Sequence, residues 1–96
     1  MSEIIVDNVR LEKYINDLKT QRDDLVRRSN TFVDEIEIIR HTMHFDDNVV
    51  DRTIKYLNMY IDKIEEAIHE IDCIIYHLEE SLDATKEYVS IYDNLK

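Results

Sequence analysis

Three side chains with metal-binding chemistry, His69, Cys73 and His77, follow one another at intervals of four residues. On a helix this spacing places them in one stripe, and imidazole nitrogen and thiolate sulfur are good ligands for zinc or copper. The stripe lies opposite the apolar face of the same segment and supplies no closed coordination shell. A solvated polar face is therefore the favoured interpretation, and the sequence predicts no metal site.

A second group of titratable residues, His41, His44, Asp46 and Asp47, stands near the middle of the chain. A His-x-x-His spacing beside carboxylates resembles half of a metal site, but no third histidine is near it in the sequence. The alternative interpretation is a turn that responds to pH, because histidine titrates near neutrality.

Carboxylates occur in adjacent pairs along the chain, at Asp23–Asp24, Asp46–Asp47, Glu65–Glu66 and Glu79–Glu80. General acid–base catalysis needs carboxyl groups with perturbed pKa values inside a cleft, and a hairpin of two helices offers no cleft. Glu66 and His69 match the Glu-x-x-His motif of di-iron bundles once, without the second copy that such a site requires. A nucleophile elbow, a glycine-rich phosphate loop and a Cys-x-x-Cys pair are also missing from the sequence. We therefore expect a protein that is not an enzyme and holds no cofactor.

The apolar residues between Val50 and Tyr92 repeat at alternating steps of four and three residues, a period that predicts a helix packed against other helices. In heptad notation, position a holds Ile54, Ile61, Ile68, Ile75, Leu82 and Val89. Position d holds Val50, Leu57, Ile64, Ile71, Leu78, Thr85 and Tyr92. A third row, at position g, holds Tyr60, Ala67, Ile74, Ser81, Tyr88 and Leu95, whereas position e is polar throughout. The apolar stripe is thus wider than one partner helix requires.

The first part of the chain, from Ser2 to about residue 42, carries a matching pattern. One row with a seven-residue repeat holds Ile4, Leu11, Leu18, Leu25, Phe32 and Ile39. Its companion row holds Asn8, Ile15, Arg22, Ser29, Ile36 and Met43. Arg22 and Ser29 interrupt this second row, where they either fix the register of the packing or, for Arg22, lay an aliphatic stem along the seam.

The pattern and the composition together predict one fold. The 96 residues include no Gly and no Pro, which favours long helices over a sheet with tight turns. The two apolar patterns lose phase near residues 42–47, where a turn would give helices of similar length. We therefore expect one all-α domain over residues 1–96, an antiparallel two-helix hairpin that pairs into a four-helix bundle or a coiled-coil assembly.

The negative charge of the chain limits the classes of partner that it can bind. A formal net charge of −10 disfavours nucleic acid and anionic membrane surfaces, because both are bound through Lys and Arg. No segment approaches the ~20 apolar residues of a membrane span, and the first residues have no signal-peptide character. We expect a cytoplasmic protein, or one exported by a route that uses no N-terminal signal.

A protein partner is the remaining expectation. The tyrosines of the chain support it, because tyrosine is common at protein interfaces, where its ring buries apolar area and its hydroxyl remains in contact with water. Four tyrosines lie just beside the a and d rows of the second helix, at Tyr56, Tyr60, Tyr76 and Tyr88. Ordinary packing at the edge of the core is the alternative interpretation for them. The sequence predicts that the interface with another chain is formed by Leu18, Leu25, Phe32, Ile36, Ile39, Leu57, Ile61, Ile64, Ile68, Ile71, Ile75, Leu78, Leu82, Tyr60 and Tyr88.

The short acidic chain with two long helices and a turn near its middle resembles the W-x-G (ESAT-like) helical-hairpin proteins of type VII secretion, and also the small helical partners of LXG-type toxins. The resemblance implies a homo- or heterodimeric four-helix bundle that is exported folded or that presents a cargo. Phe45-Asp46-Asp47 stands where that family has W-x-G, and Tyr76 with Glu80 matches its Tyr-x-x-x-Asp/Glu export signal inside the second helix. These departures favour an accessory partner over a typical secreted member.

Three functions remain in competition. The first is a secretion-associated adaptor or targeting partner that forms a helical bundle with a cargo or a sister hairpin. The second is a structural coiled-coil subunit of a phage, viral or cytoskeletal assembly. The third is a metal-binding bundle that uses His69, Cys73 and His77.

Overall fold

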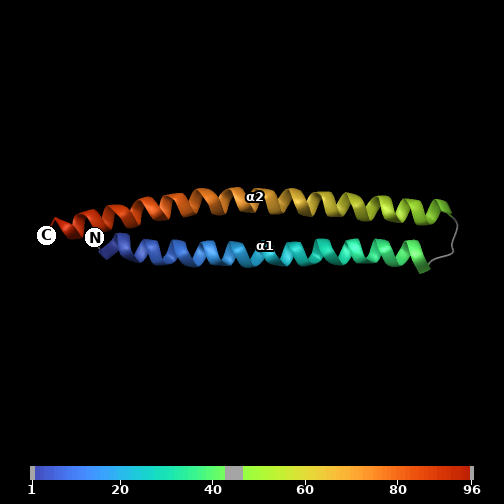
Figure 1. Ribbon diagram of the computed structural model, residues 1–96, viewed down its shortest axis with the longest axis horizontal. Helices are drawn as coiled ribbons and strands as arrows, with labels where there is room; N and C mark the ends of the chain where they lie inside the picture. Colours follow the sequence, from blue (N-terminus) through green and yellow to red (C-terminus); the bar gives the residue numbers. More distant parts are fainter. Residues whose placement is uncertain (1, 43–46, 96) are drawn as a thin grey trace. The chain divides into compact units, whose positions relative to one another are not determined.

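The computed structural model describes residues 2–42 and 47–95, and these residues form two helices, with Leu95 in a turn at the end of the second. Helix α1 is Ser2–Thr42 and helix α2 is Asp47–Asn94. They form an all-α antiparallel hairpin (Figure 1), which confirms the predicted fold class. Residues 43–46 of the predicted turn lie outside the described residues, and so do the predictions made for Met43, His44, Phe45 and Asp46.

Both helices are continuous where the sequence is most polar. The stretch Gln21 to Thr31 stays helical, although Leu25 and Val26 are its only apolar residues. Threonine is a weak helix former, and here its hydroxyl bonds back to the carbonyl oxygen four residues earlier. Thr31 donates in this way to Arg27 at 3.0 Å, and Thr53 donates to Val49 at 2.8 Å.

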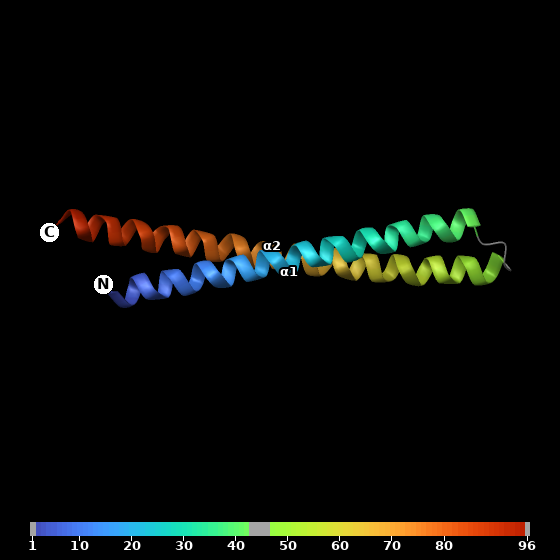
Figure 2. The same ribbon diagram turned by 90° about the horizontal axis from the view of Figure 1, so that it is seen from below.

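The chain divides into two compact units, each built from a segment of α1 and a segment of α2. The first unit joins Met1–Gln21 to Ile71–Lys96, and the second unit is Arg22–Glu70. Within the first unit the two segments run antiparallel side by side, as both views show (Figure 1 and Figure 2).

The first unit has a continuous apolar core. Ile15 and Leu18 of α1 pack with Ile75 and Leu82 of α2, and all four are buried. Half-buried side chains of the same seam close around them, namely Leu11, Ile71 and Leu78. Positions a and d of the two helices therefore meet each other within the hairpin, as the heptad period predicts.

In the second unit the seam contains buried or half-buried polar side chains as well as apolar ones. Ile36 and Ile61 are buried, and Ser29 is a buried polar side chain of this unit. Arg22 is half-buried, and its guanidinium donates to the Asp23 carboxylate at 3.2 Å. The polar stretch of the companion row thus faces α2, where each polar side chain weakens the apolar contact.

Candidate functional site

The seam leaves two flanks of the hairpin open, and they differ in charge. In an antiparallel pair of helices, position e of one helix lies beside position e of the other, and position g beside position g. Position e of α2, which we name the e row, holds Asp51, Asn58, Glu65, Asp72, Glu79, Lys86 and Asp93. Position g of α2, which we name the g row, holds Thr53, Tyr60, Ala67, Ile74, Ser81, Tyr88 and Leu95. No member of the g row carries a charge.

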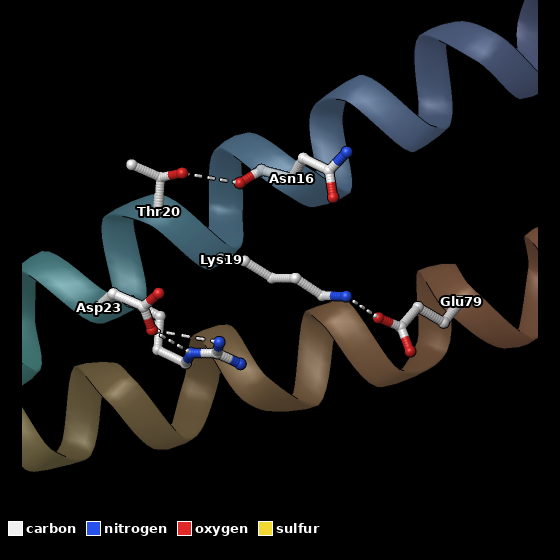
Figure 3. A network of polar contacts seen from close by, with 6 residues as sticks. Asn16, Lys19, Thr20, Asp23 and Glu79 are labelled. Carbon is white, nitrogen blue, oxygen red and sulfur yellow. Dashed lines mark hydrogen bonds and ion pairs between the residues drawn. The ribbon is translucent and has the colours of Figure 1, made fainter.

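Two ion pairs connect α1 and α2 along the e-row flank of the first unit. The Lys19 ammonium lies 2.8 Å from the Glu79 carboxylate (Figure 3), and the Lys86 ammonium lies 2.5 Å from the Glu12 carboxylate. The hydrogen bond to Glu12 raises the pKa of Lys86 above its ordinary value. These side chains stay about half exposed, so the pairs fix which residues face each other more than they add stability.

The g-row flank of the first unit is apolar and exposed. Ile74 keeps 46% of its surface exposed and Tyr88 keeps 56%. Tyr14, which occupies position g of α1 on the same flank, is 54% exposed. Large apolar side chains in solvent mark interaction surfaces when they gather on one face. The exposed hydrophobic side chains of the hairpin therefore suggest a protein partner.

The g-row flank of the second unit carries an aromatic pair. The rings of Phe32 and Tyr60 stack with centroids 6.3 Å apart and planes inclined by 21°. Phe32 is half-buried, whereas Tyr60 is 57% exposed. A shallow hollow lies beside the pair and is lined by Leu25, Arg27, Arg28, Thr31, Phe32 and Ile64. The hollow offers apolar surface with two guanidinium groups at its rim.

Those guanidinium groups are held by one carboxylate. Arg27 donates to Asp24 at 2.8 Å, and Arg28 lies 3.6 Å from the other oxygen of the same carboxylate. The hydrogen bond from Arg27, together with the charge of Arg28, lowers the pKa of Asp24. Asp24 thus orients both arginines beside the hollow.

The predicted interface residues fall into two groups. The seam members are buried or half-buried between α1 and α2, namely Leu18, Leu25, Phe32, Ile36, Ile39, Leu57, Ile61, Ile64, Ile68, Ile71, Ile75, Leu78 and Leu82. Tyr60 and Tyr88 instead lie exposed in the g row. A contact of any of these residues with another chain stays a prediction.

The candidate metal ligands lie on the outside of α2. His69, Cys73 and His77 are all exposed, and the His77 imidazole lies 3.9 Å from the Glu80 carboxylate. Among the described residues, no group of three or more His, Cys, Asp or Glu side chains is placed to hold a metal ion. His41, the described member of the second histidine pair, lies 3.2 Å from the Glu37 carboxylate.

Sequence reasoning noted Tyr56 among the tyrosines beside the seam, but it missed the other apolar residues beside the g row, Ile38 and Val49. Ile38 of α1 and Val49 and Tyr56 of α2 are each more than half exposed. They occupy position c, which adjoins position g on a helix, and so they widen the apolar flank of the second unit. The signal available in the sequence was their heptad position, which extends the apolar stripe beyond position g.

Comparison with known proteins adds no family. The chain matches no family model, no curated protein and no solved structure with which it was compared. Within residues 2–42 and 47–95, neither helix has a stretch long and apolar enough to cross a membrane.

Proposed function

We propose that this protein is a non-catalytic binding module that forms a helical bundle with another helical chain through the g-row flank. The observation that carries the proposal is the contrast between the rows of α2. In a chain of net charge −10, the g row is uncharged and keeps Tyr60, Ile74 and Tyr88 exposed. A helix that packs on this flank gains a free energy of about 25 cal/mol per Å² of apolar area removed from water, and it leaves the interhelical ion pairs of the e-row flank intact.

The finer proposal is a role in type VII secretion, as an adaptor or targeting partner for a cargo or a sister hairpin. Its support is the architecture, because two helices that end at Thr42 and resume at Asp47 divide the chain as the resemblance implies. Tyr76 and Glu80 are exposed and hydrogen-bonded to each other, which raises the pKa of Tyr76. Under this proposal the protein acts in the cytoplasm or leaves by a route without an N-terminal signal.

A second candidate is a structural subunit of a coiled-coil assembly. The observation that favours it is a further set of exposed apolar residues near the start of α1, where Ile5, Val6 and Val9 are each about half exposed. These residues lie away from the g-row flank, at positions e, f and b. A subunit that contacts two neighbours needs a second apolar surface of this kind, whereas an adaptor with one partner does not.

Photo-crosslinking in the cells that produce the protein tests the proposal. Benzoylphenylalanine is placed at Tyr60 of the g row or at Asn58 of the e row, two residues away on the same helix. We expect a protein adduct from position 60 and none from position 58 after irradiation, because only the g row faces a partner. Mass spectrometry then identifies the adduct as a second copy, a cargo or an assembly neighbour. No adduct from position 60, or equal adducts from both positions, would contradict the proposal.

A further inference from the structure

The g-row flank of the second unit is a place where two acidic chains can meet without like charges facing each other. The g-row residues of this unit, Thr53, Tyr60 and Ala67, are uncharged, and the adjoining Val49 and Tyr56 are apolar and exposed. Two copies of a chain with net charge −10 repel each other over most of their surface. Self-association therefore favours this flank over the e-row flank, which carries several carboxylates.

The charges on α1 complement themselves on the same flank. Arg28 and Glu35 are both exposed, occupy position g of α1 and stand two helical turns apart. When two identical helices meet antiparallel around a twofold axis, each residue faces the one reflected through the centre of the contact. If the twofold axis passes between Thr31 and Phe32, Arg28 of each copy lies opposite the partner's Glu35. One contact between two copies then contains two such ion pairs.

We propose that a second copy of this chain docks head to tail on the second unit, with Arg28 of each copy beside the partner's Glu35. The inference rests on the proposed function, because it names the partner that the g-row flank binds. Tyr60, which stacks on Phe32, then lies near the twofold axis and packs against the partner's Tyr60.

The hollow beside the aromatic pair is a surface on which the docked copy can pack. In head-to-tail docking, residues that follow the centre of the contact in one α1, and the α2 residues beside them, lie over residues that precede it in the other copy's α1. The partner's Ile38 and the partner's Tyr56 would thus lie over the hollow that Leu25, Phe32 and Ile64 line. Both are more than half exposed in the single hairpin, and covering them removes that apolar area from water.

Charge exchange tests the contact in the full-length chain. Sedimentation equilibrium gives the dimer dissociation constant of the wild type, Arg28→Glu, Glu35→Arg and the double variant R28E/E35R. We expect each single change to raise the dissociation constant about tenfold or more, because like charges then face each other across the axis. The double variant restores opposite charges and returns to within about threefold of the wild type.

Arg40→Glu is the matched control, since it removes the same charge from the same helix at position e. It also breaks a local ion pair with Glu37, as Arg28→Glu does with Asp24. We expect it to leave the dissociation constant within about threefold of the wild type. Circular dichroism confirms that every variant stays helical.

Two results would overturn the inference. One is a dimer that the double variant weakens as much as the single variants do. The other is a wild-type chain that stays monomeric at every concentration. A monomer leaves the proposed function open, because crosslinking at Tyr60 detects a different helical partner equally well. The absence of any adduct would instead contradict the proposed function itself.

Discussion

Neighbouring isoleucines on α2 show how sharply the hairpin separates core from surface. Ile75 keeps 5% of its surface exposed and belongs to the core of the first unit, whereas Ile74 keeps 46% and belongs to the g row. The side chains are chemically identical and adjacent in sequence. Their heptad positions alone decide that one stabilises the hairpin and the other remains available to a partner.

Alanine substitution at these two positions should separate the two roles. We expect Ile75→Ala to lower the free energy of unfolding by about 2–5 kcal/mol, because it leaves a cavity in a packed core. Ile74→Ala should lower it by less than about 1 kcal/mol, because a half-exposed side chain loses little apolar contact. Urea unfolding followed by circular dichroism at one low protein concentration measures both. Equal losses would mean that the core extends around α2 to the g row.

Cys73 should tolerate substitution, since it lies exposed on the outside of α2. We expect Cys73→Ser to change the free energy of unfolding by less than about 0.5 kcal/mol, as is typical of a surface position. Melting with and without added zinc, in the wild type and in the variant, completes the measurement. A rise in melting temperature with zinc that Cys73→Ser removes would instead establish a ligand role.

The two helices are held in register by the pairs on the e-row flank. Lys19 with Glu79 and Glu12 with Lys86 lie on successive heptads of the first unit. A shift of one heptad would put Lys19 opposite Lys86, or Glu12 opposite Glu79. These charges therefore destabilise shifted registers of the two helices, which the apolar seam alone would tolerate.

Exchanging one of these pairs tests its part in the register. Lys19→Glu should lower the free energy of unfolding by about 0.5–1 kcal/mol at low salt, because two carboxylates then face each other in an exposed setting. Adding Glu79→Lys should restore most of the loss, and high salt should remove the difference. Lys13→Glu, on the exposed outer side of the same helix, is the control. A loss that the second change does not restore would show that the pair does not couple the helices.

The helices and their seam were predictable from the sequence because one period of apolar residues runs through each of them. The helix ends at Thr42 and Asp47 agree with the predicted turn. The sequence alone did not show which flank stays open. That depends on which residues face each other across the seam, and the facing of Lys19 and Glu79 is a property of the folded hairpin. Tyr60 illustrates the limit, since spacing placed it near an interface but did not reveal its stack on Phe32.

The net charge shapes what the whole molecule can bind. At −10 the chain repels acidic surfaces, including its own copies, wherever carboxylates line the contact. The g row offers an exception along α2, and within the second unit it lies beside the balanced charges of Arg28 and Glu35. Our central expectation is therefore that this protein associates with its own copies through the g-row flank, and not through the e-row flank.

The solution mass of the purified chain tests that claim most directly. Light scattering over a range of concentrations compares the wild type with Tyr60→Glu and Asn58→Glu, which each add one negative charge to α2 two residues apart. We expect a wild-type dimer of about 23 kDa, twice the chain mass of 11.6 kDa. We also expect Tyr60→Glu to be monomeric and Asn58→Glu to stay dimeric. A wild-type monomer at every concentration, or a dimer that Asn58→Glu dissociates and Tyr60→Glu does not, would contradict self-association through the g-row flank.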